Sequence, residues 1–82
     1  MSQIREHVAK IWMNLLKVEE VADDSDFFDS GGTSITAVYF AADIQDECQL
    51  AVDAVEVILN PKFGELVALV RERSAEQKRK GV

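Results

Sequence analysis

The apolar residues near the start of the chain recur with the 3.6-residue period of an amphipathic helix. We therefore expect a first helix over residues 2–17, with Ser2 as its N-cap. Polar and charged side chains occupy the opposite positions, so one face should be buried and the other solvated. The apolar stripe consists of Ile4, Val8, Ile11, Trp12, Leu15 and Leu16.

Three more helices are predicted downstream. The second begins at Ser34 and ends near Cys48 or Gln49. A short third helix with Asp53 as its N-cap ends at Asn60, because a residue before proline avoids helical dihedral angles. Pro61 suits the first position of the last helix. The residues expected to be buried on the second and last helices are Ala37, Ala41, Ile44, Cys48, Phe63, Leu66, Val67 and Val70.

Residues 18–33 are predicted to form a long loop between the first and second helices. Its aspartates, serines and glycines favour turns over helix interiors. A loop of this length in so small a domain is usually functional. The apolar side chains expected to pin it to the core are Val21, Phe27 and Phe28.

Length and composition limit the number of domains, the kinds of partner and the cellular compartment that we expect. Eighty-two residues make one small domain, which we place at residues 1–74, with a charged and disordered tail at 75–82. The net charge of −6 disfavours nucleic acid as a partner. A single cysteine and the lack of an apolar run of about 20 residues favour a cytoplasmic protein without a membrane span. We expect a monomer.

The usual catalytic and metal-binding arrangements are missing from the sequence. His7 is the one histidine and has no paired nucleophile, and Cys48 occupies a position that faces the core. The acidic residues between 23 and 29 lack the spacing of a calcium-binding EF-hand loop. Gly31 and Gly32 are not followed by the Gly-Lys-Ser/Thr ending of a P-loop. We therefore expect a non-catalytic protein with no metal site.

The segment Gly31-Gly32-Thr33-Ser34-Ile35 is the strongest candidate for a functional site. Two glycines lead to a serine at the start of a predicted helix, where free backbone N–H groups and the helix dipole favour an anion such as phosphate. The alternative is that Thr33 or Ser34 only caps the second helix.

The sequence around this segment resembles the phosphopantetheine-dependent carrier proteins. The likeness rests on Asp26-Phe27-Phe28-Asp29, the Gly-Gly-Thr-Ser-Ile segment, the interval from Ser34 to Asn60-Pro61, and residues 63–67. It extends from the first helix to about Val70 and is closest to the peptidyl carriers of nonribosomal peptide synthesis. The resemblance implies an all-α, four-helix, acyl-carrier-like bundle with three main helices and a short third one.

The resemblance also implies a role for Ser34. A separate transferase would attach 4′-phosphopantetheine from coenzyme A to this serine, and the thiol of the arm would hold an aminoacyl or acyl group as a thioester. Partners would be the phosphopantetheinyl transferase, an adenylating or acyl-activating enzyme, and a downstream condensing, tailoring or thioesterase enzyme. By their place around the serine, Thr33, Ile35 and Val38 would contribute to partner docking, although Ile35 and Val38 could equally be ordinary packing residues.

Several features depart from the family pattern. Ser30 stands where the family commonly has Leu or Ile, Thr33 replaces Asp, His or Asn, and Gln49 replaces a glycine. The Thr-Ser-Ile sequence favours the peptidyl branch over fatty-acid carriers. An acyl carrier of fatty-acid or polyketide synthesis, a D-alanyl carrier, and a helical docking module without a cofactor remain as alternatives. Because the chain starts at Met1 and ends soon after the last helix, we expect a discrete carrier.

Overall fold

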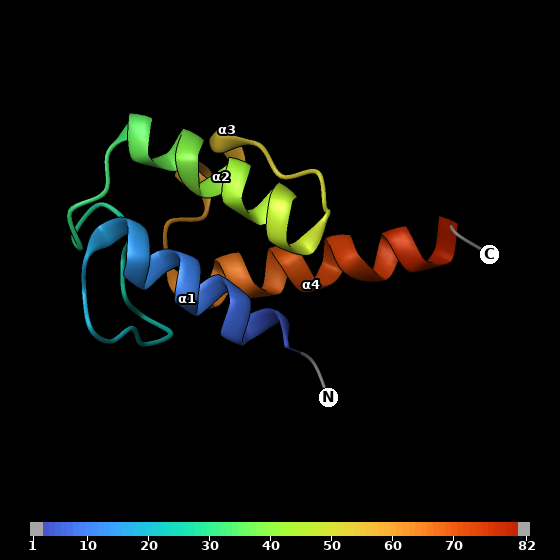
Figure 1. The fold of residues 1–82 in the computed structure, drawn as a ribbon, viewed down its shortest axis with the longest axis horizontal. Helices are drawn as coiled ribbons and strands as arrows, with labels where there is room; N and C mark the ends of the chain where they lie inside the picture. Colours follow the sequence, from blue (N-terminus) through green and yellow to red (C-terminus); the bar gives the residue numbers. More distant parts are fainter. Residues whose placement is uncertain (1–2, 81–82) are drawn as a thin grey trace.

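The computed structural model describes residues 3–80, and it describes the side chains of residues 3–76. Within this range the chain forms four helices and no strand (Figure 1). The predicted all-α fold with a short third helix is therefore confirmed. The helices are α1 (Ile4–Leu16), α2 (Ser34–Cys48), α3 (Ala54–Leu59) and α4 (Phe63–Lys80).

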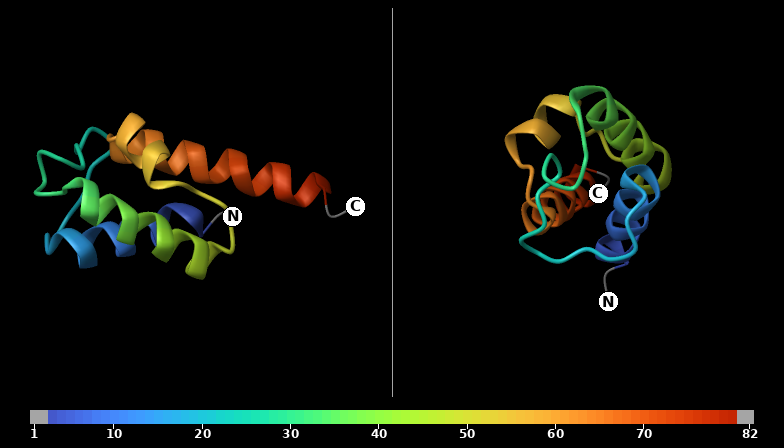
Figure 2. Two further views of the ribbon diagram at one scale, coloured as in Figure 1. Left: turned by 90° about the horizontal axis from the view of Figure 1, so that it is seen from above. Right: turned by 90° about the vertical axis from the view of Figure 1, so that its left-hand side faces the viewer.

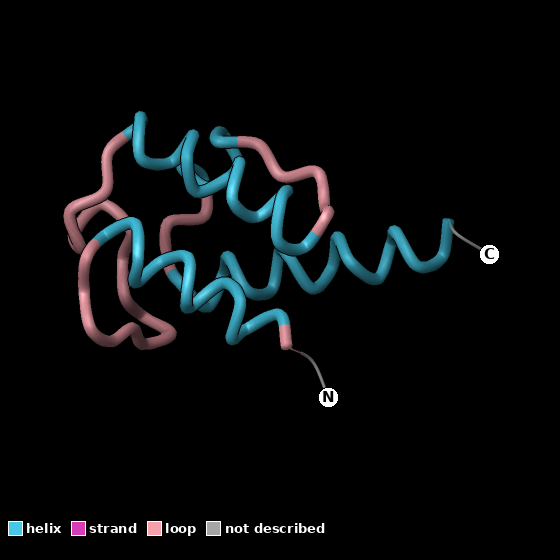
Figure 3. Tube along the Cα trace, viewed as in Figure 1, coloured by secondary structure: helices cyan, strands magenta, loops and turns pink. Residues whose placement is uncertain are grey.

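The helices form a bundle around one apolar core. α1 packs against both α2 and α4, and α3 packs against α2, as the end-on view in Figure 2 shows. The α1–α2 loop and the α3–α4 connection lie at the end of the bundle where α2 begins (Figure 3). Both connections therefore lie at the same end of the bundle as the candidate serine, Ser34, at the start of α2.

Trp12 is the centre of the core. Its fully buried ring makes edge-to-face contacts with Phe27 and Phe63 at centroid distances of 5.5 Å, and with Phe40 at 6.2 Å. These partners come from the α1–α2 loop, α4 and α2, respectively. Edge-to-face aromatic pairs stabilise a fold by about 0.5–1.5 kcal/mol beyond their burial. One side chain of α1 thus joins three other parts of the chain.

The α1–α2 loop is fixed to the bundle by backbone hydrogen bonds as well as by Phe27. The Phe27 N–H donates to the carbonyl of Pro61 at 2.7 Å, and the Phe63 N–H donates to the carbonyl of Ser25 at 2.8 Å. Phe27 is fully buried as expected, whereas Phe28 is 38% exposed and stacks edge-on against Phe27. Only one of the two rings fits between the helices.

The start of α4 differs from the prediction. Pro61 precedes the helix, which begins at Phe63, and the carbonyl of Lys62 accepts the hydrogen bond from Leu66 N–H. Lys62 forms an isolated antiparallel bridge with Asp26. This pairing keeps residues 61 and 62 extended, so tertiary contact overrides the preference of proline for the first helical position.

The start of α1 and the end of α4 also differ from the predicted bounds. α1 begins at Ile4 with Gln3 at the cap position, and Ser2 lies outside the described residues. α4 continues as a helix to Lys80, although disorder was expected from residue 75. Residues 71–80 are rich in arginine, glutamate, alanine, glutamine and lysine, which favour helix even without apolar anchors. The division at residue 74 stays a prediction.

A charged pair ties α3 to α4. Arg73 on α4 forms a two-pronged ion pair with the carboxylate of Glu56 on α3. Arg73 also donates to the carbonyl of Ala51, with Nη1 2.6 Å from the oxygen. The hydrogen bond from Arg73 lowers the pKa of the Glu56 carboxyl below its ordinary value, with a smaller contribution from the backbone N–H of Asp53.

We predict that Gly32→Ala destabilises the domain by about 1–3 kcal/mol, because overpacking strains a filled core. An added Cβ at position 32 would overlap the Phe27 ring and lie 2.7 Å from the Phe27 carbonyl oxygen. Urea unfolding followed by tryptophan fluorescence measures the free energy of unfolding. Ser30→Ala, in the same loop, serves as the control; equal stability of Gly32→Ala and wild type would contradict the predicted overlap.

We also predict an acid-dependent loss of stability from Glu56. Its pKa in the folded protein is lower than in the unfolded chain, so its stabilisation is fully present above the ordinary carboxyl pKa. The stabilisation is lost as the pH falls from there through the lowered value. Glu56→Gln should therefore reduce the slope of unfolding free energy against pH between about pH 5 and 3. Glu65→Gln, which removes an exposed carboxylate from α4, should leave that slope nearly unchanged.

Candidate functional site

Ser34 is the first residue of α2, and it is exposed to solvent. A serine at this position has its hydroxyl beside the positive end of the helix dipole, near backbone N–H groups that have no partner within the helix. The predicted helix start at Ser34 is thus confirmed. A group attached to the hydroxyl would extend into solvent rather than into the core.

Thr33 caps the helix. Its Oγ1 accepts a hydrogen bond from the backbone N–H of Thr36 at 3.2 Å and lies 3.0 Å from the Thr36 hydroxyl. The backbone of Thr33 is extended, as is usual for an N-cap. Among residues 3–76, no side chain or backbone group is hydrogen-bonded to the Ser34 hydroxyl. Capping is therefore the role of Thr33, and the Ser34 hydroxyl is available for chemistry.

The loop before Ser34 is ordered by short-range hydrogen bonds. The Asp26 carboxylate accepts from the N–H groups of Phe28 and Asp29 at 2.9 and 3.1 Å. The Gly32 N–H donates to the Phe27 carbonyl at 2.8 Å. Gly31 has a φ of 104°, a backbone conformation that residues with a side chain rarely adopt. The two glycines therefore let the chain turn closely over Phe27 and reach the start of α2.

The predicted docking residues lie around Ser34 on the outer face of α2. Thr33 is exposed, and the side chains of Ile35 and Val38 are 68% and 55% exposed. Most of each side chain therefore faces solvent, and the role of both residues in docking stays a prediction. Sequence reasoning did not single out four further exposed apolar residues, although the i, i+3, i+4 spacing of the three on the short helix indicates a second apolar face there. The further exposed apolar residues are Tyr39 on α2 and Val55, Ile58 and Leu59 on α3.

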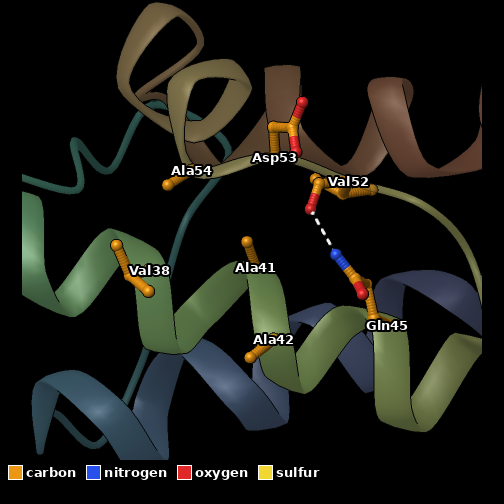
Figure 4. Close-up of a pocket in the computed structure, with 7 residues that line it drawn as sticks. All are labelled: Val38, Ala41, Ala42, Gln45, Val52, Asp53 and Ala54. Atoms are coloured by element: carbon orange, nitrogen blue, oxygen red, sulfur yellow. Dashed lines mark hydrogen bonds between the residues drawn. The ribbon is translucent and has the colours of Figure 1, made fainter.

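A shallow pocket lies between α2 and the segment that leads into α3 (Figure 4). Val38 and Ala41 line one side, and Val52 and Ala54 line the other. The Gln45 side chain donates to the Val52 carbonyl at 3.0 Å and bridges the two sides. The pocket places Val38 of α2 opposite Ala54, the first residue of α3.

The remaining candidate groups form no second site. His7 is half-buried on α1, and Cys48 packs against the core, where burial and the nearby Glu47 raise the pKa of its thiol. In the part of the chain that the structure describes, no three His, Cys, Asp or Glu side chains cluster in a way that could hold a metal ion. No described helix combines the length and apolarity that crossing a bilayer requires.

The surroundings of Ser34 fit a phosphate-linked group. The residue is exposed, its neighbours Gly31 and Gly32 carry no side chains, and the nearest helix end favours negative charge. A Cβ added at Gly31 would meet no atom within 4 Å, so the space around this glycine is open.

Comparison with known proteins agrees with this geometry. The chain is 30% identical over 66 residues to HC-toxin synthetase of Cochliobolus carbonum, and 33% identical over 67 residues to cytosolic 10-formyltetrahydrofolate dehydrogenase of Homo sapiens. These matches cover 80% and 79% of this chain, but only 1% and 7% of those much longer proteins.

A solved structure shows the same fold. The solution structure of an active-site mutant peptidyl carrier protein superimposes with a TM-score of 0.81 at 26% identity, over 90% of this chain and 82% of that one. In addition, residues 6–70 match the family described as "phosphopantetheine attachment site". The chain therefore belongs to the phosphopantetheine attachment-site family, as a carrier domain like the peptidyl carriers, with covalent 4′-phosphopantetheine as its cofactor.

Proposed function

We propose that Ser34 is the residue that receives 4′-phosphopantetheine and that the domain carries aminoacyl or peptidyl intermediates in nonribosomal peptide synthesis. The observation that carries the proposal is the exposed Ser34 at the start of α2, left free because Thr33 caps the helix. The match to the attachment-site family and the likeness to a peptidyl carrier support it.

The attached arm supplies a thiol that holds its cargo as a thioester. The protein positions the root of the arm and leaves the rest free. A phosphodiester at Ser34 is stabilised by the N-terminus of α2 by roughly 0.3–1 kcal/mol at an exposed position. This energy is too small to immobilise a long flexible arm, so the arm can reach the active sites of several partners. The chain itself catalyses no step.

The proposal implies a defined set of cytoplasmic partners. A phosphopantetheinyl transferase installs the arm, an adenylating or acyl-activating enzyme loads it, and a condensing, tailoring or thioesterase enzyme removes the cargo. Each partner must approach the same serine, so each must contact the surface around it. The exposed Thr33, Ile35 and Val38 are proposed as part of that surface.

We predict that incubation with coenzyme A, magnesium and a broad-range phosphopantetheinyl transferase adds the mass of one phosphopantetheine group. Ser34→Ala should abolish the gain, because it removes the nucleophilic hydroxyl. Intact-protein mass spectrometry measures both results. Ser30→Ala, which removes a different hydroxyl four residues earlier, should be modified like wild type. The proposal would be overturned by folded wild-type protein that gains no mass.

We predict that Ile35→Ser and Val38→Ser weaken docking but leave the chemistry intact. Losing the partial burial of one aliphatic side chain costs about 1–1.4 kcal/mol, or about a 5- to 10-fold rise in the KM of the transferase for the apo-protein. The kcat should change less than the KM. Initial rates of arm attachment give both constants. Ala68→Ser, an exposed position on α4, is the control, and a KM for the Ile35 and Val38 variants equal to that of this control would exclude them from the docking surface.

A further inference from the structure

The exposed face of α3 extends the apolar surface around Ser34. Leu59 is 71% exposed and Val55 is 61% exposed, so these side chains are presented to solvent rather than packed inside. Val38 on α2 and Ala54 on α3 line opposite sides of the same pocket, which places the start of α3 beside the exposed side of α2 (Figure 4). We call Val55, Ile58 and Leu59 the α3 face.

The α3 helix cannot hold this face in place by itself. It has six residues, far fewer than an isolated helix needs to be stable in water. Of residues 54–59, all of which the structure describes, Val57 alone is buried in the core. The orientation of the α3 face must therefore depend on other contacts.

Packing against α2 supplies part of this support, and Arg73 and Glu56 add contacts with α4. The Arg73 guanidinium forms its two-pronged pair with Glu56 and also donates to the Ala51 carbonyl, so it holds α3 and the preceding connection together. The Glu56 carboxylate in turn accepts a hydrogen bond from the Asp53 N–H at 3.1 Å, at the start of the helix. Both side chains are about 70% shielded from solvent, with 30% and 27% of their area exposed.

We propose that Arg73 and Glu56 are positioning residues for partner docking, which hold the α3 face in line with Ile35 and Val38 on α2. The occupant of this joint surface is the transferase that modifies Ser34, through an apolar face of its own. Any enzyme that reaches Ser34 meets the adjoining residues of α2, and the pocket that Val38, Asp53 and Ala54 line joins α2 to the start of α3. This inference rests on the proposed function of Ser34.

The central test measures arm attachment by a broad-range phosphopantetheinyl transferase with coenzyme A. Arg73→Gln should raise the KM for the apo-protein by about 3- to 10-fold and change kcat by less than about twofold. Arg71→Gln removes the same charge from an exposed position two residues earlier on α4, and it should behave like wild type. Glu56→Gln keeps an oxygen that can accept from Arg73, so its KM should rise less.

A double-mutant cycle separates positioning from a general loss of stability. Leu59→Ser should raise the KM by itself, because it alters an exposed side chain of the α3 face. If Arg73 acts through that face, the double variant Arg73→Gln/Leu59→Ser should have nearly the KM of the worse single variant. Assays run well below the melting temperature of each variant keep all of them folded, as circular dichroism can verify.

The outcomes distinguish this inference from the proposed function. Failure of wild-type protein to gain the arm would overturn both. Modification of wild type, together with an unchanged KM for Arg73→Gln or Leu59→Ser, would overturn the positioning role and leave Ser34 as the attachment site. Additive effects in the cycle, or an equal KM rise for Arg71→Gln, would also overturn it, because the effect would then not pass through the α3 face.

Discussion

The edge-to-face packing of Trp12 against Phe27, Phe40 and Phe63 is the interaction on which the rest of the structure depends. A small domain buries a limited fraction of its surface, so each large side chain carries an unusual share of its stability. Here one ring of α1 meets rings from a loop and two other helices. Removing any of these rings would loosen several elements at once.

The position of Ser34, the proposed attachment residue, follows from that packing. Phe27 draws the α1–α2 loop onto the core, and its backbone then bonds to Pro61 on one side and to Gly32 on the other. Because Gly32 follows the Phe27 ring closely, the chain arrives at Thr33 in an extended conformation, and α2 begins at the next residue. A buried aromatic ring thus sets where an exposed hydroxyl lies, seven residues further along the chain.

The two functional requirements of a carrier are met by separate parts of the fold. The arm needs an exposed attachment point with little side-chain bulk, which the glycines and the helix start provide. Partners need a surface to recognise, and exposed apolar side chains gather on α2 and α3. α3 is too short to set its own orientation, so it depends on its packing against α2 and on the Arg73–Glu56 ion pair with α4. We regard this pair as the link between the stability of the bundle and its recognition.

The sequence alone was sufficient for the local features of this protein. Hydrophobic periodicity predicted the three long helices, Asp53 and the Asn60-Pro61 pair predicted the limits of α3, and the resemblance around Ser34 predicted the family. It was insufficient where residues distant in the sequence come into contact. The bridge between Asp26 and Lys62 makes α4 begin at Phe63 rather than at Pro61. Arg73 pairs with Glu56, which lies 17 positions earlier in the chain. The exposure of the α3 face was also decided by tertiary structure, because a six-residue apolar helix can bury only one side, and the neighbouring helices determine which. Periodicity and local dihedral preferences act within a few residues, whereas these choices depend on packing in three dimensions.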